Sequence, residues 1–158
     1  MLLGVAGLTP GDWPTVDENV AKTVREHGFR TLQLRVPDPL NRDPATVERV
    51  KNAFASAGLA LGQTVGEYGG GLVSDDESIR HDAVEALKQM ATFTRIIGGT
   101  NTYLRPGSMN PGGAWWPHPD NRSDQVFDRL VKSAREAAQA ASDEGVMLAV
   151  EGGVVCPL

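Results

Sequence analysis

The sequence predicts an α/β protein in which five parallel β-strands alternate with four α-helices. Two observations carry this prediction: short apolar or alternating runs are followed by longer segments of helical period, and long loops follow strands whereas the turns after helices are short. Each helix then returns the chain to the same end of the sheet, which favours parallel pairing. The predicted strands span residues 2–7, 30–36, 59–65, 100–105 and 146–151.

The predicted helices have recognisable starts and stops. A short polar residue that can accept a backbone hydrogen bond precedes each helix, and Pro44 stands at the first position of the second one. The predicted N-caps are Thr15, Asp43, Ser74 and Ser123. A glycine ends each helix, because glycine adopts the left-handed backbone angles of a helix C-terminus without strain. The predicted stops are Gly28, Gly58, Gly98 and Gly145.

Two architectures fit this order of elements for a single domain over residues 1–158. A five-stranded doubly wound parallel sheet would be complete at this length, whereas a (β/α)8 TIM barrel of roughly 250 residues would be present only in part. The first strand-to-helix turn has no G-x-G-x-x-G pattern, so no dinucleotide site is expected. Both architectures place functional residues at the carboxyl ends of strands, where the long loops 66–73 and 106–122 begin.

Composition narrows the class of partner. The formal charge of −5 leaves no basic face for a nucleic acid backbone. Cys156 is the single cysteine, which excludes an internal disulfide and fits a reducing compartment. The first residues are too short a run to span a bilayer and lack the basic residues of a secretion signal. We therefore expect a cytoplasmic protein that binds neither nucleic acid nor membranes.

Glu151 is the leading candidate for chemistry. It follows the apolar run 146–150, and a carboxylate at the end of a buried parallel strand has to be paired, metal-bound or protonated. Side chains two residues apart share a face, so Glu151 should lie on the face of Met147 and Ala149 and point into the mouth of the sheet or barrel. The alternative is a solvated acid at a strand end.

The loop 104–121 is the second signal. Its prolines and glycines fix turns, while Trp115, Trp116 and His118 offer large amphipathic surfaces to a ligand. Because two exposed tryptophans would leave an apolar patch without cover, we expect the loop to fold over the strand ends. The alternatives are a hydrophobic plug or a subunit contact for the tryptophans, and a structural role for the histidine.

Polar residues at other strand ends extend the candidate site. Arg35 and Arg105 end their strands, where two guanidinium groups would suit a phosphate or a carboxylate unless each pairs with a nearby acid. Glu67 and Tyr68 precede the glycines 69–71, which let backbone amides approach an anion or form a flexible lid. No G-K-[ST] follows these glycines, so the loop is not a nucleotide-type phosphate loop.

Three segments together resemble the sugar phosphate isomerase/epimerase family of xylose isomerase-like TIM barrels: LQLRV at 32–36, YLRPGSMNPGGAWWPHPDN at 103–121 and LAVEGGVVCPL at 148–158. The resemblance implies the first five strands of such a barrel, with further metal ligands on strands six to eight. It also implies that Glu151 binds a divalent metal, Mn²⁺ or Mg²⁺ being favoured by oxygen ligands, and moves a proton between adjacent carbons. The chain has Gly152 and Gly153 where relatives carry a histidine.

The resemblance thus implies a metal-dependent sugar or sugar-phosphate isomerase or epimerase, with Glu151 as its catalytic and metal-binding residue. The residues expected to bind the sugar or sugar phosphate are Arg35, Glu67, Tyr68, Arg105, Trp115, Trp116 and His118. As the N-terminal part of a barrel, the chain is expected to be inactive alone and to self-associate through open strand edges. The alternative is a non-catalytic half-barrel that binds or assembles with another chain. A phosphodiesterase acting on damaged DNA is disfavoured by the acidic charge.

Overall fold

The predicted strands form one parallel sheet that carries its helices on a single face. The computed structural model describes residues 2–8, 11–67 and 70–152. The strands are β1 (Gly4–Val5), β2 (Thr31–Arg35), β3 (Ala60–Val65), β4 (Asn101–Leu104) and β5 (Met147–Val150). The helices are α1 (Glu18–Glu26), α2 (Pro44–Ser56), α3 (Glu77–Ile97) and α4 (Asp124–Asp143), with the 3₁₀ turns η1 (Trp13–Thr15), η2 (Gly71–Val73) and η3 (Pro119–Arg122) between them.

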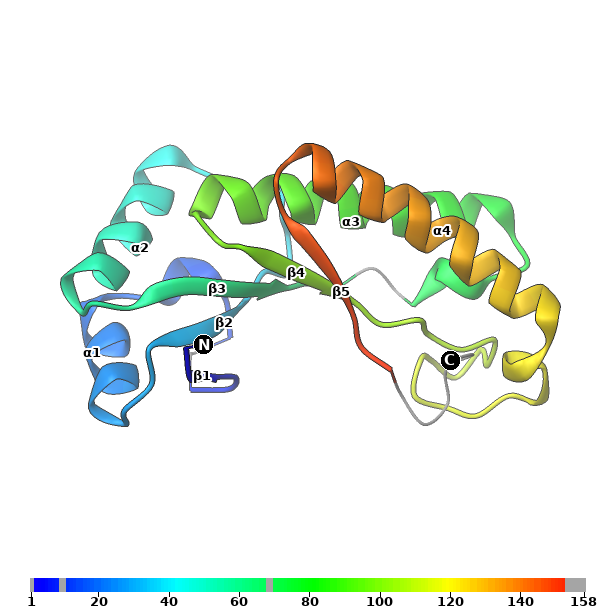
Figure 1. The fold of residues 1–158 in the computed structure, drawn as a ribbon, viewed down its shortest axis with the longest axis horizontal. Coiled ribbons are helices and arrows are strands. Elements are labelled where there is room, and N and C mark those ends of the chain that lie inside the picture. Colours follow the sequence, from blue (N-terminus) through cyan, green and yellow to red (C-terminus); the bar gives the residue numbers. More distant parts are fainter. Residues whose placement is uncertain (1, 9–10, 68–69, 153–158) are drawn as a thin grey trace.

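The order of the strands decides between the two predicted architectures. The strands follow one another in chain order, β1-β2-β3-β4-β5, and every neighbouring pair is parallel. Figure 1 shows an arch with the helices along its convex side and the sheet beneath them. This is the arrangement of a partial (β/α)8 barrel. The doubly wound alternative is wrong, because that fold reverses its strand order and covers both faces of the sheet with helices.

The observed helix termini agree in part with those predicted from the sequence. The predicted stop glycines all have positive φ angles, between 64° and 87°, and two of the four predicted caps are confirmed. The other two are wrong: Asp17 caps α1 in place of Thr15, and Asp76 caps α3 in place of Ser74. In both cases a carboxylate lies nearer the helix, and its charge-assisted hydrogen bond to the backbone amides is stronger than that of a hydroxyl.

Two apolar clusters join the helices to the convex face of the sheet. The first surrounds Trp13, whose ring meets that of Phe93 edge to face with centroids 5.1 Å apart, and includes Leu32 and Leu34 of β2. The second surrounds Leu104 of β4 and joins it to α3 and α4. The first strand is shorter than the predicted 2–7, because it lies at the edge of the sheet with β2 as its one neighbour. No helix in the described ranges is long and apolar enough to cross a lipid bilayer.

Candidate active site at the carboxyl ends of the strands

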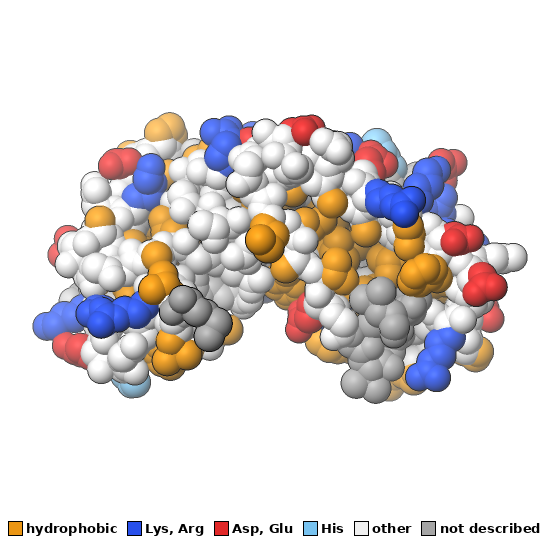
Figure 2. Space-filling view, in the orientation of Figure 1, with side chains coloured by type: hydrophobic (Ala, Val, Ile, Leu, Met, Phe, Trp, Pro, Cys, Tyr) orange, Lys and Arg blue, Asp and Glu red, His pale blue; other side chains and the backbone are white. Residues whose placement is uncertain are grey.

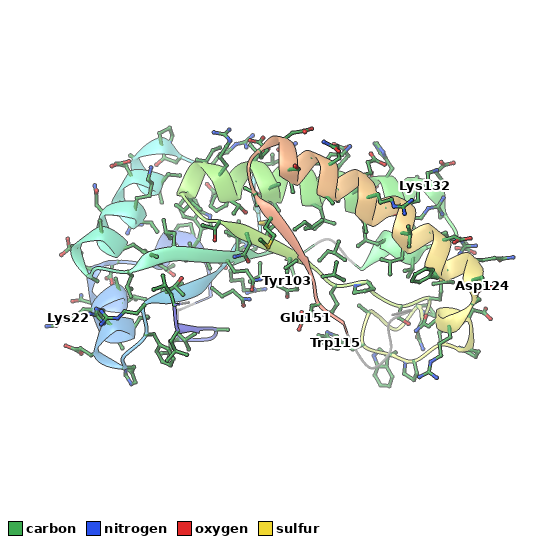
Figure 3. All side chains as sticks on the ribbon, viewed as in Figure 1. Lys22, Tyr103, Trp115, Asp124, Lys132 and Glu151 are labelled. Atoms are coloured by element: carbon green, nitrogen blue, oxygen red, sulfur yellow. The ribbon has the colours of Figure 1, made fainter. Side chains whose placement is uncertain are left out.

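Alternation along β4 divides its side chains between the two faces of the sheet. Thr102 and Leu104 are fully buried on the helix side, so Tyr103 and Arg105 face the concave side. The ladder continues just beyond β5, where the amide of Glu151 donates to the carbonyl oxygen of Leu104 at 2.9 Å. This register places Glu151 beside Arg105 on the concave side. Figure 3 shows Tyr103, Trp115 and Glu151 near one another at this end of the sheet.

Arg105 is the centre of the cluster. Its Nη2 donates to Glu151 Oε2 at 2.7 Å and to the hydroxyl oxygen of Tyr103 at 3.2 Å. Its guanidinium carbon also lies 4.1 Å from the centroid of the Trp115 ring and 5.5 Å from that of Tyr103. A guanidinium on an aromatic face is attracted by the negative charge of the π-system. The side chain of Arg105 is therefore fixed by an acid on one side and by an indole on another.

A pocket of about 270 Å³ opens beside this cluster. Its walls come from the loops after β3 and β4 and from the end of β4, and consist of Gly66, Glu67, Gly70, Tyr103, Arg105, Ala114 and Trp115. Figure 2 shows the underside of the arch hollowed out. Burial raises the pKa of Tyr103 above its ordinary value, and the nearby carboxylate of Glu151 adds to the rise against the opposing charge of Arg105. The tyrosine hydroxyl therefore stays protonated and can donate a hydrogen bond.

The second predicted arginine also has an acidic partner. Arg35 Nη2 lies 3.3 Å from Glu67 Oε1, and both side chains are more than half exposed. Of the two possibilities for the strand-end arginines, pairing with acids is the one found: Glu67 pairs with Arg35, and Glu151 pairs with Arg105. The mouth of the half-barrel thus has two positive charges that are each balanced by a carboxylate.

The tryptophan loop agrees with its prediction in part. It lies at the strand ends, where Ala114 and Trp115 line the pocket. Trp115 is 65% exposed and Trp116 is 60% exposed, so the reason given for this placement, that the two rings need cover, is wrong. Arg105 covers one face of Trp115, which reduces its need for burial. Trp116 takes no part in lining the pocket beside Arg105.

Of the remaining predicted residues, His118 stands apart from the pocket. His118 caps η3, where its Nδ1 accepts a hydrogen bond from the amide of Asp120 at 3.2 Å, which is the structural role considered for it. Tyr68 and Cys156 lie outside the described residues. The site therefore unites Glu67, Arg105, Trp115 and Glu151 of the predicted set, with Arg35 bound to its edge.

A divalent metal does not fit the described residues by themselves. No group of three or more His, Cys, Asp or Glu side chains close enough to hold an ion occurs in the described part of the chain. Glu151 offers one carboxylate, and Arg105 is bound to it at 2.7 Å. Mn²⁺ and Mg²⁺ take about six oxygen ligands, several of them from protein or substrate. The metal role of Glu151 stays a prediction that needs ligands from elsewhere.

Sequence reasoning missed two features of the site. Tyr103 forms part of the pocket wall, and its alternation with Arg105 was the available signal. Asn121 is 3% exposed and bonds to the other end of its loop, at Ser108 and Met109. Nothing in the sequence distinguishes this asparagine from other polar loop residues, because its role depends on contacts made across the loop.

Comparison with protein families and with solved structures gives a consistent result. The model of a family described as xylose isomerase-like TIM barrel matches residues 21–152. The comparison with curated protein sequences found no match. Solved structures that match include a D-psicose 3-epimerase determined in the presence of D-fructose, with a TM-score of 0.72 and 15% identity over 94% of this chain and 51% of that one.

Two further structures show the same fold. A 3-keto-D-glucoside 4-epimerase from E. coli has a TM-score of 0.70 and 18% identity, over 95% of this chain and 55% of that one. An L-ribulose 3-epimerase has a TM-score of 0.68 and 18% identity, over 93% of this chain and 48% of that one. The chain thus spans about half the length of these structures.

Proposed function

The chain belongs to the xylose isomerase-like TIM barrel family, and from this premise we propose that it forms the sugar-binding face of an epimerase or isomerase acting on uncharged sugars. The observation that carries the proposal is the Arg105–Glu151 pair beside Tyr103 and Trp115, at the strand ends where (β/α)8 enzymes hold their active sites. The epimerases that share the fold support the reaction class.

The charges at the mouth favour an uncharged sugar over a sugar phosphate. Arg35 and Arg105 are each balanced by a carboxylate at 3.3 Å and 2.7 Å, respectively. A phosphate placed beside either arginine would also approach Glu67 or Glu151, and like charges in a partly buried site repel. Hydroxyl groups, in contrast, can both donate to the carboxylates and accept from the guanidinium groups.

The residues present suit proton transfer next to a carbonyl carbon. In the proposed step the Glu151 carboxylate takes the proton from the carbon next to the carbonyl. The electron pair of that C–H bond forms the C=C bond of an enediolate, and the π-electrons of the carbonyl group move to its oxygen, which becomes negatively charged. Arg105 and the protonated Tyr103 stabilise that oxygen by donating hydrogen bonds. Trp115 offers an apolar surface to the carbon side of the sugar ring. A proton delivered by a second acid to the opposite face of the same carbon completes epimerisation, and return of the proton to the former carbonyl carbon completes isomerisation.

Hydrogen exchange tests this proposal without requiring the whole reaction. The chain is incubated with D-fructose or D-psicose in deuterated water, with and without Mn²⁺, and loss of the carbon-bound proton is followed by NMR. Glu151→Gln should abolish the exchange. Glu144→Gln is the matched control, because Glu144 is also partly exposed and paired with an arginine, Arg95, but precedes β5 at the other end of the strand.

Two results would count against the proposal. Tighter binding of D-fructose 6-phosphate than of D-fructose would contradict the charge argument. Equal loss of exchange in Glu151→Gln and Glu144→Gln would show that the strand-end carboxylate has no special part in the chemistry.

A second candidate, a module that assembles with another chain, is favoured by the edge of the sheet. Among the described residues β5 pairs with β4 alone, and Met147 and Val150 on it are 68% and 53% exposed. Such an edge is a template for a further strand. Light scattering with size exclusion should show a mass above the monomer that Val150→Lys lowers, while Ile79→Lys on α3 leaves it unchanged. A monomer at all concentrations would contradict this candidate.

A further inference from the structure

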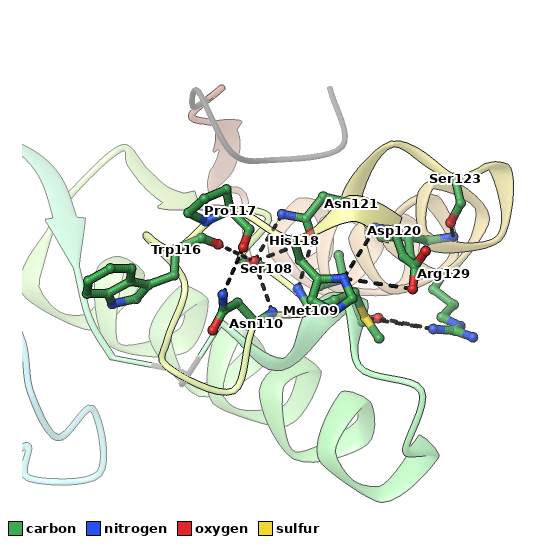
Figure 4. Close-up of polar contacts among 12 residues, drawn as sticks. Ser108, Met109, Asn110, Trp116, Pro117, His118, Asp120, Asn121, Ser123 and Arg129 are labelled. Carbon is green, nitrogen blue, oxygen red and sulfur yellow. Dashed lines mark hydrogen bonds and ion pairs between the residues drawn. The ribbon is translucent and has the colours of Figure 1, made fainter.

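The loop 106–122 is held by a buried polar centre within it. Asn121 is 3% exposed, although most of its neighbours in the loop are exposed. Its Oδ1 accepts a hydrogen bond from the amide of Met109 at 2.9 Å, and its Nδ2 donates to Ser108 Oγ at 3.0 Å (Figure 4). The end of the loop is thereby bonded to its beginning.

Ser108 connects Asn121 to the part of the loop that carries the tryptophans. Its Oγ donates to the carbonyl oxygen of Trp116 at 2.6 Å and accepts from the amide of Asn110 at 3.1 Å. Asn110 in turn donates through Nδ2 to the carbonyl oxygen of Pro117 at 2.8 Å. The backbone on the C-terminal side of Trp115 is therefore held by two hydrogen bonds, one from Ser108 and one from Asn110, which is itself bonded to Ser108 (Figure 4).

We propose that Asn121 is a positioning residue for the pocket: through Ser108 it holds Trp115 against Arg105, and so fixes the wall on which a ligand would lie. The ring of Trp115 is one residue from the carbonyl that Ser108 holds, and it lies 4.1 Å from the guanidinium carbon. Trp115 is 65% exposed, so packing around the ring contributes little to its placement. Apart from its contact with Arg105, the placement of the ring therefore depends on the backbone bonds. The part of this inference that concerns a ligand rests on the proposed function.

An amide is required at position 121 because both of its ends are used. Oδ1 accepts from a backbone amide while Nδ2 donates to the hydroxyl oxygen of Ser108. Oδ1 also lies 3.3 Å from Ser108 Oγ, but the carbonyl oxygen of Trp116, at 2.6 Å, is the nearer acceptor for the hydroxyl hydrogen. An aspartate has the same shape but no donor, so it would take the hydroxyl hydrogen for itself and break the connection to Trp116. Asn121→Asp therefore separates this role from simple filling of space.

The test reads the position of the Trp115 ring directly. In NMR, the side-chain protons of Arg105 above the indole ring are shifted upfield by its ring current. The chemical shifts of the same protons in Trp115→Ala, which lacks the ring, are the reference value. Asn121→Asp and Ser108→Ala should each lose more than half of this shift at a temperature well below melting. Ser133→Ala is the matched control, because Ser133 is 4% exposed and its hydroxyl donates to the carbonyl oxygen of Leu72 in a different part of the fold.

The outcomes separate this inference from the proposed function. Retention of the shift in folded Asn121→Asp overturns the inference, and so does equal loss in Ser133→Ala. If Asn121→Asp does not fold, Ser108→Ala decides in the same way. With D-fructose as the probe, dissociation constants should rise roughly tenfold in the Asn121 and Ser108 variants, because a smaller fraction of molecules has the binding-competent loop. Loss of the shift together with no fructose binding by the unaltered chain upholds the positioning role and refutes the proposed function.

Discussion

The two loops that form the pocket are in contact at a pair of glycines. Adding one methyl group to either glycine should force the loops apart. Gly107, after β4, and Gly70, after β3, have φ angles of 88° and 64°. A Cβ added to Gly107 would lie 2.9 Å from the carbonyl carbon of Gly70 and closer still to its oxygen. Side chains do not tolerate that distance from a backbone. Gly107→Ala therefore has to move one loop away from the other.

The magnitude follows from two contributions. Left-handed backbone angles cost alanine about 1–2 kcal/mol, and a contact this close adds about 1–3 kcal/mol of overpacking. Gly145→Ala is the matched control, because Gly145 has a φ of 70° but no atom lies within 4 Å of an added Cβ. Gly145→Ala therefore has the cost of the left-handed backbone angles but not the cost of overpacking. It should lower the melting temperature by about 2–8 °C and leave the pocket unchanged.

The difference between the two variants should appear in ligand binding. If the clash opens the loops, Gly107→Ala should weaken D-fructose binding about 5- to 150-fold beyond any change in Gly145→Ala, which is the equivalent of 1–3 kcal/mol. Calorimetry measures the dissociation constants, and the ring-current shift of Arg105 reports the pocket without a ligand. Equal melting temperatures and equal shifts in the two variants would refute the argument, because the contact between the loops would then have no energetic consequence.

Two further predictions concern single side chains. Trp115→Ala should weaken D-fructose binding while Trp116→Ala leaves it within twofold, because only the first ring lines the pocket; equal effects in a binding titration would contradict the pocket geometry. The hydrogen bonds from Thr92 and Arg95 lower the pKa of Glu144 below its ordinary value of 4.5. These bonds therefore contribute their full stabilisation above about pH 4.5, and the contribution is lost as the pH falls through the lowered pKa. Urea unfolding of Glu144→Gln should show a flatter acid limb than that of the unaltered chain, and parallel limbs would contradict the assignment.

The order of elements could be predicted from the sequence because it depends on local periodicity. The glycine stops needed only the left-handed conformation that ends a helix, and all of them were placed correctly. The caps at Thr15 and Ser74 were misplaced because in each case an aspartate two residues later competes for the backbone amides, and that competition depends on where the helix starts. The choice of barrel over doubly wound sheet depended on strand order, which periodicity does not specify.

Some members of the candidate site could be predicted from the sequence, but their arrangement could not. Strand-end positions identified Arg105 and Glu151, yet their ion pair depends on the register between β4 and β5. The exposure of Trp115 was mispredicted because burial was assumed to be the one way to satisfy an indole, whereas the guanidinium group of Arg105, at the start of the same loop, covers one of its faces. Both differences depend on contacts that strand and helix periodicity does not specify.

The concave face of the sheet explains why a ligand, rather than a packed core, suits this half-barrel. Barrel interiors are usually filled by branched apolar side chains, but here Gln33 donates to Gln63 at 2.6 Å and Tyr103 and Arg105 follow towards the mouth. The leucines of β2 and β4 lie on the opposite face, against the helices. Polar groups on a partly buried face cost stability unless they are hydrogen-bonded. A polyhydroxylated ligand can form hydrogen bonds with such groups, whereas apolar packing cannot. Along β5, Met147 lies on the same face as Glu151, whereas Val150 lies on the face of Leu104, so of these two exposed apolar side chains only Val150 points away from the site.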